Sequence, residues 1–229
     1  VAGGYASGAL GPGGNRLLFG RQVLDRGAVA VTIDAGAAPR TAVAHACRPV
    51  GDPFTVTRAE RNMIYELAGV TAYERLSGVI EALSPDDRAL AARGSLQCGI
   101  VVDDRKVDFG AGDFVVRELL GVDRSNGALA LTGEVETGAA VQFQVRDPDA
   151  AEVELYRACG DAPADAALVF TCTARGAHLF GEPHREITTI AEASGARVVA
   201  GMACAGEFGA IATRNFVHTQ TASMAFFTR

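Results

Sequence analysis

The stretch Cys172-Thr-Ala-Arg175-Gly176 follows an apolar run and combines residue types that could do chemistry. An arginine can hold a carboxylate in a two-pronged, charge-assisted contact, and a cysteine thiolate can act as a nucleophile. Side chains at the carboxyl end of a strand often face a ligand in proteins that combine helices with sheets. The same pattern is compatible with Cys172 as a small buried residue and Arg175 as an ordinary surface charge.

A second group of polar residues lies in "GEFGAIATRNFVHTQTAS", residues 206–223, beside the most apolar part of the chain. Its members are Glu207, Asn215, His218, Thr219 and Thr221. If residues 216–226 form one strand, His218 and Ser223 face opposite sides, because side chains alternate along a strand. Cys172 and His218, with Glu207 orienting the imidazole, would make a thiol-nucleophile triad if the three segments meet.

Arg48 is the third candidate, and it lies in "HACRPV" at the end of a predicted strand. It could line a pocket together with the two groups above. Arginines in such places more often pair with a nearby carboxylate at the surface.

Residues for metal or cofactor chemistry are missing from the sequence pattern. His178 and His184 are six residues apart across a loop, and His45 and Cys47 lack a third ligand with recognised spacing. The phosphate-binding glycine loops and the nucleophilic-serine elbow do not occur either. We therefore expect neither a metal nor a cofactor.

The composition restricts the function classes. The 229 residues carry a net charge of −6 without a basic cluster, which argues against a nucleic-acid partner. Five widely spaced cysteines, an odd number, indicate reduced thiols and a cytoplasmic protein rather than a disulfide framework. The sequence has no apolar run long enough to cross a bilayer, so we expect no membrane association.

The elements that must position these residues follow from hydrophobic periodicity and end signals. Thr71 and Glu74 form a capping box that predicts a helix over 71–84, and Gly195 should end a helix over 184–195 whose Ile187, Ile190 and Ala191 point inward. Residues 1–14 are glycine-rich and predict a loop. The strands are expected at 96–104, 113–123, 127–135, 139–147, 166–174, 197–206 and 216–227, the four from 96 to 147 as an antiparallel meander.

Together these elements predict an α+β fold, a mixed and largely antiparallel sheet system flanked by helices. A two-sheet α-β-β-α sandwich is one arrangement that fits them.

Five motifs in sequence order resemble the C-terminal module of the FIST family. They are "CRPVGDPFTVTRAERNMIYEL", "VVRELLGVD", "VQFQVRD", "ALVFTCTARGAHLFG" and "AGMACAGEFGAI…NFVHTQTAS". This resemblance implies a FIST C-terminal module over residues 41–229. Residues 1–40 resemble the last strands of the FIST N-terminal module, and the start at Val1 instead of Met indicates processing or a piece of a longer chain.

The resemblance implies an intracellular sensory domain of signal transduction that binds a small ligand, for which amino acids have been proposed. It supplies no catalytic residues. The chain departs from the commoner pattern at Met202-Ala203-Cys204, where aromatic residues are usual, and at Thr219-Gln220, where a glycine and an aromatic residue are frequent. These changes would alter the shape of a pocket.

The preferred hypothesis is therefore non-catalytic binding of an amino-acid-like ligand between the segment around Arg175 and the segment that follows Glu207. Arg175 would bind the ligand carboxylate and Glu207 its amine. The other proposed ligand-binding residues are Cys172, Gly176, Asn215, His218, Thr221 and Arg48. The alternatives are an enzyme that uses Cys172 and a protein-interaction scaffold, and the partners would be a signalling protein or a second copy in a homo-oligomer.

Overall fold

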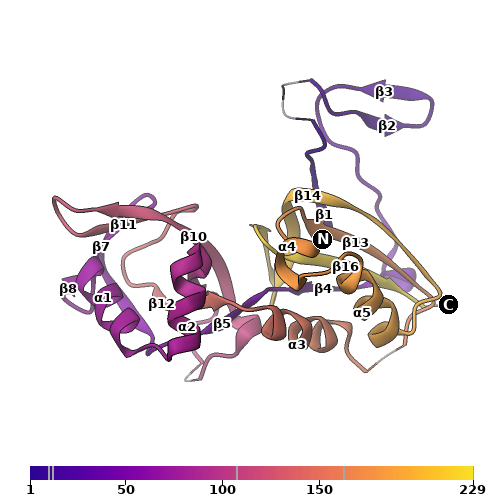
Figure 1. The fold of residues 1–229 in the computed structure, drawn as a ribbon. Coiled ribbons are helices and arrows are strands. Elements are labelled where there is room, and N and C mark those ends of the chain that lie inside the picture. The colour runs from indigo at the N-terminus through magenta and orange to yellow at the C-terminus, as the bar shows by residue number, and fades with distance from the viewer. Residues whose placement is uncertain (10, 12, 107, 162, 229) are drawn as a thin grey trace. The chain divides into compact units, whose positions relative to one another are not determined.

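The computed structural model describes residues 1–9, 11, 13–106, 108–161 and 163–228. The chain divides into two compact units, which are described separately (Figure 1). Unit 1 comprises Val1–Ala44 and Leu155–Arg229, and unit 2 comprises His45–Glu154. Helices coexist with sheets whose strand pairs are mostly antiparallel, so the predicted α+β class is confirmed.

Unit 1 contains a mixed six-stranded sheet in the order β1-β14-β13-β16-β4, with β15 paired to the far end of β14. Its strands are β1 (Ala2–Ala6), β4 (Arg40–Ala44), β13 (Ala166–Cys172), β14 (Val198–Ile211), β15 (Arg214–His218) and β16 (Ala222–Phe227). β13 and β14 are parallel, and α4 (Ala177–Phe180) and α5 (Arg185–Ser194) connect them. β13 ends at Cys172, which pairs with Cys204, so the carboxyl end of β13 meets the middle of the longer strand β14.

The core of unit 1 lies between this sheet and helices. Leu155 on α3 (Pro148–Cys159) and Ile190 on α5 pack against Val169 and Met224 of the sheet. The helix predicted over 184–195 is confirmed, and Gly195 ends it with a positive φ of 67°. The inward position predicted for Ile187 is wrong, because that side chain is exposed and Glu186 is buried instead.

The prediction of a loop at residues 1–14 is wrong for Ala2–Ala6, which form strand β1 against β14. Glycine content indicated a loop, but here it permits a close approach of two backbones. A Cβ atom on Gly4 would collide with the sulfur of Cys204. The chain continues through a separate hairpin, β2 (Leu17–Phe19) and β3 (Gln22–Leu24), and a short turn, η1 (Ala35–Ala37), before β4.

Unit 2 is built on an eight-stranded sheet in the order β11-β10-β9-β12-β6-β7-β8, with β5 on β12. Its strands are β5 (Cys47–Pro49), β6 (Phe54–Glu60), β7 (Met63–Leu67), β8 (Val70–Thr71), β9 (Leu96–Val101), β10 (Phe114–Asp123), β11 (Ala128–Leu131) and β12 (Ala140–Arg146). β11 also pairs with β7, which closes the path into a ring.

The four strands predicted between residues 96 and 147 are confirmed as β9 to β12. β9, β10 and β11 follow one another as a meander, whereas β12 returns to pair with β9. The two large sheets belong to different units. The sheet of unit 2 closes on itself, whereas the two-sheet α-β-β-α sandwich considered from the sequence would require an open layer.

The helices of unit 2 are α1 (Ala72–Ala82) and α2 (Pro85–Leu90), followed by the turn η2 (Ala91–Ser95); η3 (Ala111–Asp113) precedes β10. The predicted cap of α1 is confirmed, since the hydroxyl of Thr71 accepts a hydrogen bond from the backbone N–H of Glu74. Leu76 and Val79 of α1 pack on Leu67 and Phe143 in the core of the ring.

Candidate functional site

The candidate site of unit 1 lies where the carboxyl end of β13 meets the middle of β14. Cys172 and Cys204 are direct partners in the register of these strands. Both cysteines are buried. The backbone N–H of Cys172 donates to the carbonyl of Thr221 at 2.9 Å, so the segment before β16 is attached at the same point.

Glu207 reaches this point because β14 carries an extra residue relative to β1. Ala6 pairs with Cys204 and Gly4 with Glu207, so three steps on β14 match two on β1. Gly206, whose φ is 141°, lies within this β-bulge. A bulge changes which side of a strand the next side chain faces, and it is the local reason why Glu207 turns into the interior.

The carboxylate of Glu207 is fully buried and hydrogen-bonded. One oxygen accepts from the N–H of Gly206 at 3.1 Å, and the other accepts from the N–H and hydroxyl of Thr221 at 3.2 and 2.9 Å. Burial raises the pKa of Glu207, although these hydrogen bonds and the charge of Arg175 partly oppose the shift. Arg175 and Glu207 therefore belong to one electrostatic neighbourhood.

Arg175 is also buried, with 2% of its surface exposed, so it is not a surface charge. Its Nε–H donates to Glu186 in a buried ion pair, and the hydroxyl of Thr171 donates to the second oxygen of the same carboxylate. Glu186 lies in the first turn of α5, where the helix dipole favours a negative charge. The sequence predicted that Arg175 binds a ligand carboxylate. Its Nε–H instead donates to the carboxylate of Glu186, a residue of the protein.

One edge of the Arg175 guanidinium still lacks a partner. Nη1 donates to the backbone carbonyl of Gln220 at 3.3 Å, and the ring of Phe180 lies 5.7 Å from Cζ. Nη2 is buried and has no hydrogen-bond partner among the described residues. Buried guanidinium nitrogens are normally paired, so this atom is a candidate contact for a ligand.

The segment between β15 and β16 connects the two halves of this cluster. The sequence allowed a single strand over 216–226, but the strand breaks at Gln220, whose φ is 60°. His218 therefore lies on β15 and Ser223 on β16. Both side chains bond to the same stretch of β14. Nε2 of His218 donates to the carbonyl of Gly209 at 3.1 Å, and the hydroxyl of Ser223 donates to the carbonyl of Phe208 at 2.6 Å.

The hydrogen bonds described for the proposed triad involve other groups. The Glu207 carboxylate accepts from Gly206 and Thr221, and Nε2 of His218 is used by Gly209. Cys204 pairs with Cys172 on the neighbouring strand, and burial raises the pKa of Cys204 to about 11, with the charge of Glu207 adding to the shift. Cys204 is therefore disfavoured as a thiolate.

The remaining unit 1 candidates have backbone or surface positions. Gly176 precedes α4 with a φ of 64°, a conformation that glycine adopts without strain, and its carbonyl accepts from Leu179 and Phe180. Asn215 is exposed on β15, opposite Ala210 of the hairpin. The structure thus brings together Cys172, Arg175, Glu207 and Thr221, with His218 beside Glu207, but leaves Asn215 outside the buried cluster.

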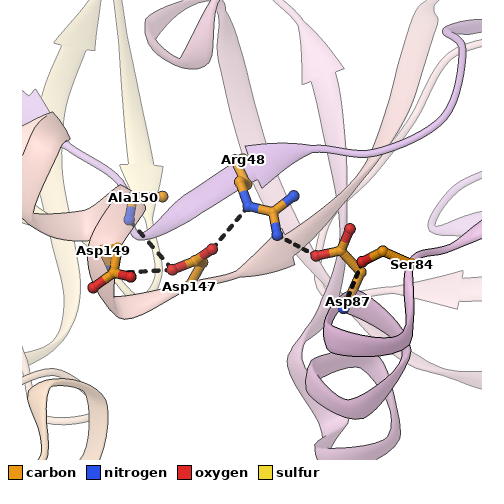
Figure 2. A network of polar contacts seen from close by, with 6 residues as sticks. All are labelled: Arg48, Ser84, Asp87, Asp147, Asp149 and Ala150. Atoms are coloured by element: carbon orange, nitrogen blue, oxygen red, sulfur yellow. Dashed lines mark hydrogen bonds and ion pairs between the residues drawn. The ribbon is translucent and has the colours of Figure 1, made fainter.

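Arg48 belongs to a different network, in unit 2 (Figure 2). Its Nε–H donates to Asp147 at 2.8 Å, and Nη2 donates to Asp87. The backbone N–H of Asp87 donates to the hydroxyl of Ser84, the cap of α2, at 3.1 Å. Figure 2 shows the guanidinium lying between the two carboxylates, so Arg48 joins β5 to the starts of α2 and α3.

The charges of this network stabilise one another. The hydrogen bond from Arg48 lowers the pKa of Asp87. Burial alone would raise the pKa of Asp147, but Arg48 and the backbone N–H groups of Ala150 and Asp149 outweigh it, so the net shift is downward. Both carboxylates in turn raise the pKa of Arg48. The arrangement matches the alternative interpretation of Arg48 from the sequence, in which this arginine pairs with nearby carboxylates.

Glu186 is the principal residue of the cluster that was not predicted from the sequence. The signal was present, because an acidic residue in the first turn of a helix is common and Arg175 lies only a loop away. The apolar periodicity of the helix, however, assigned the inward position to Ile187.

Within the described residues, no group of three or more His, Cys, Asp or Glu side chains could hold a metal ion. In the same part of the chain, no helix is long and apolar enough to span a bilayer.

Comparison with known proteins adds a family assignment to this geometry. The model of the FIST N domain matches residues 1–70, and that of the FIST C domain matches residues 70–210. These matches meet at residue 70, whereas the compact units divide after residues 44 and 154. The domain boundary at residue 40, expected from the sequence, stays a prediction.

The chain is also similar to proteins described as uncharacterised. One from Mycobacterium bovis is 44% identical over 233 residues, and one from Mycobacterium tuberculosis is 42% identical over 233 residues. Each match covers 99% of this chain, which spans 60% of the length of these relatives. No solved structure matches the chain significantly.

Proposed function

The chain belongs to the FIST family, and we propose that it is a sensory module whose unit 1 binds an amino acid without catalysis. FIST domains are in general sensory domains that bind small ligands in signal transduction. The observation that carries the proposal is the buried Nη2 of Arg175, which has no partner among the described residues although the rest of the guanidinium is engaged.

An amino acid matches the charges around this atom. Its carboxylate would accept from Nη2 of Arg175, and its ammonium would donate to Glu207. The charge of Glu186 already balances that of Arg175. A zwitterion therefore adds no net charge to the cluster, whereas a simple anion would leave an uncompensated buried charge. Thr221 and His218, adjacent to Glu207, would contribute polar contacts.

The test is calorimetric titration of the chain with the standard amino acids, using Arg175→Lys as the informative variant. Lysine retains a positive charge for Glu186 but cannot present a second nitrogen to a ligand. The proposal predicts binding to the wild type and affinity about tenfold or more lower in the variant, because a hydrogen bond to a charged group is lost.

Arg48→Lys is the matched control, since it makes the same exchange at an arginine whose carboxylates come from the protein. Its affinity should equal that of the wild type. Absence of binding by every amino acid, or equal affinities in all three proteins, would refute the proposal.

A contact with a partner protein is the second candidate, because one segment presents apolar side chains to solvent. Leu18, Phe19 and Val23 on the β2–β3 hairpin are between 62% and 69% exposed. Apolar side chains exposed together are typical of interaction sites. Changing Phe19 and Val23 to serine should reduce self-association in sedimentation or capture of a signalling partner; unchanged results in both assays would reject this role for the hairpin.

A further inference from the structure

Unit 2 contains two buried amide side chains whose polar atoms lack partners. Gln97 on β9 is 3% exposed and Gln144 on β12 is 1% exposed. Among the described residues, neither Oε1 of Gln97 nor Nε2 of Gln144 has a hydrogen-bond partner. Leaving a buried donor or acceptor unpaired is unfavourable, and native proteins contain few such groups. Two such unpaired groups on adjacent strands indicate a place where a small molecule could supply the missing hydrogen bonds.

The two amides lie on the same face of the sheet. Gln97 and Gln144 are opposite one another in the antiparallel pairing of β9 and β12, so their side chains leave the same side. The alternating neighbours Cys98, Phe143 and Val145 point instead into the core of the ring. Gln97 and Gln144 therefore lie on the face of the sheet that points away from the core of the ring, and both are buried there.

Gly99 leaves room for the amide of Gln144. A Cβ atom at this position would collide with Nε2 of Gln144 and crowd the ring of Phe114. The Gln144 amide thus lies over the backbone of Gly99, two residues along β9 from Gln97. The absence of a side chain at Gly99 gives this donor its place.

The surroundings of the two amides are apolar. Phe114 and Val116 of β10 form a buried cluster with Cys47, and Phe109 packs edge-on against Phe114 with ring centres 5.9 Å apart. The charged neighbours on this face, Glu118 and Arg146, are engaged in contacts of their own. Beside this buried apolar cluster, Nε2 of Gln144 is a donor and Oε1 of Gln97 an acceptor without partners among the described residues.

We propose that this face binds a small planar molecule that carries a primary amide or a ring lactam. The carbonyl of such a group would accept from Nε2 of Gln144, and its N–H would donate to Oε1 of Gln97. A carboxylate supplies no donor for Gln97, and an ammonium supplies no acceptor for Gln144. The ring of the ligand would lie against Phe114. Because Phe109 covers part of this ring, the ligand enters when Phe109 moves aside.

The experiment compares nicotinamide with nicotinate, which have the same ring but differ in whether they offer an N–H donor. Saturation-transfer NMR and calorimetry should detect nicotinamide bound to the chain, and nicotinate should bind about tenfold more weakly or not at all. Gln97→Leu and Gln144→Leu should each weaken nicotinamide binding about tenfold.

Gln142→Leu is the matched control on β12, because the Gln142 amide already donates to the carbonyl of Gly51 at 2.7 Å. It should leave nicotinamide affinity unchanged. The melting temperatures of Gln97→Leu and Gln144→Leu should equal or exceed that of the wild type, since each replacement removes a buried polar atom that has no partner among the described residues.

Two results would overturn the proposal. One is equal binding, or none, of nicotinamide and nicotinate to the wild type. The other is a melting temperature lowered by several degrees in both leucine variants with nicotinamide affinity unchanged, which would mean that the two amides bond to each other and serve the fold.

Discussion

Arg175 in unit 1 and Arg48 in unit 2 show two uses of an arginine beside carboxylates. Arg48 is 38% exposed in its side chain and donates to two carboxylates, Asp87 and Asp147. The side chain of Arg175 is fully buried, donates to one carboxylate, Glu186, and retains an unpaired nitrogen among the described residues. The less accessible guanidinium thus has the less complete set of partners.

Under the proposed function, this difference separates the structural contact of Arg48 from the ligand contact of Arg175. Water can satisfy the free nitrogens of a half-exposed arginine, so the Arg48 network is complete as it stands. The buried Nη2 of Arg175 lacks this access to solvent, and under the proposed function a bound ligand supplies its hydrogen bond. The comparison gives opposite expectations for matched changes in the two units.

The largest effect is expected from Arg175→Met, which removes the charge but keeps much of the volume. It leaves Glu186 buried without its cation, a change that typically lowers the free energy of unfolding by about 3–5 kcal/mol. Urea denaturation followed by circular dichroism measures the loss. A loss below about 1 kcal/mol would show that the Glu186 carboxylate is solvated after all.

Arg48→Met should have a smaller effect. The pairs it breaks are partly exposed and screened by solvent, so we expect a loss of about 1 kcal/mol or less, reduced further by salt. The same urea titration at low and high ionic strength provides the measurement. A loss as large as that of Arg175→Met would remove the distinction between the two arginines.

The smallest effect concerns pH and has opposite signs in the two units. The pKa values of Asp87 and Asp147 are lowered, so the stability they contribute is present above their ordinary pKa and is lost as pH falls through the lowered values. The pKa of Glu207 is raised by burial, so its contribution is present below its ordinary pKa and is lost as pH rises through the raised value.

Glu207→Gln should therefore gain stability relative to the wild type as pH rises, whereas Asp147→Asn should lose its disadvantage as pH falls. Unfolding titrations across the acidic to neutral range test both signs. Curves for Glu207→Gln that run parallel to the wild type would contradict a raised pKa for Glu207.

The sequence was most informative where local signals determine structure. Thr71 predicted the start of α1 and Gly195 the end of α5, because a cap and a positive φ depend on a few neighbouring atoms. Arg175 and Glu207 were also placed in one neighbourhood, and this is where they lie. The strand expected over 197–206 continues as β14 to Ile211, so Glu207 lies within the strand and not after its end.

Features that depend on contacts between distant parts of the chain could not be predicted from local sequence signals. Gly3 and Gly4 indicate a loop until β14 is known to lie beside them, and Glu186 looks solvent-exposed until Arg175 is placed opposite. The closure of the unit 2 ring depends on β7 and β11, about sixty residues apart in the chain. Polar residues such as Gln97 and Gln144 carry no signal of burial in the sequence alone.

Side-chain NMR of the guanidinium groups probes the proposed ligand contact at Nη2 of Arg175 itself. With arginine labelled by ¹⁵N, the Arg175 resonances, assigned by the Arg175→Lys variant, should shift when the chain is saturated with the amino acid found by calorimetry. The Arg48 resonances should stay in place and serve as the internal reference. Unshifted Arg175 resonances in the presence of a bound amino acid would contradict the account.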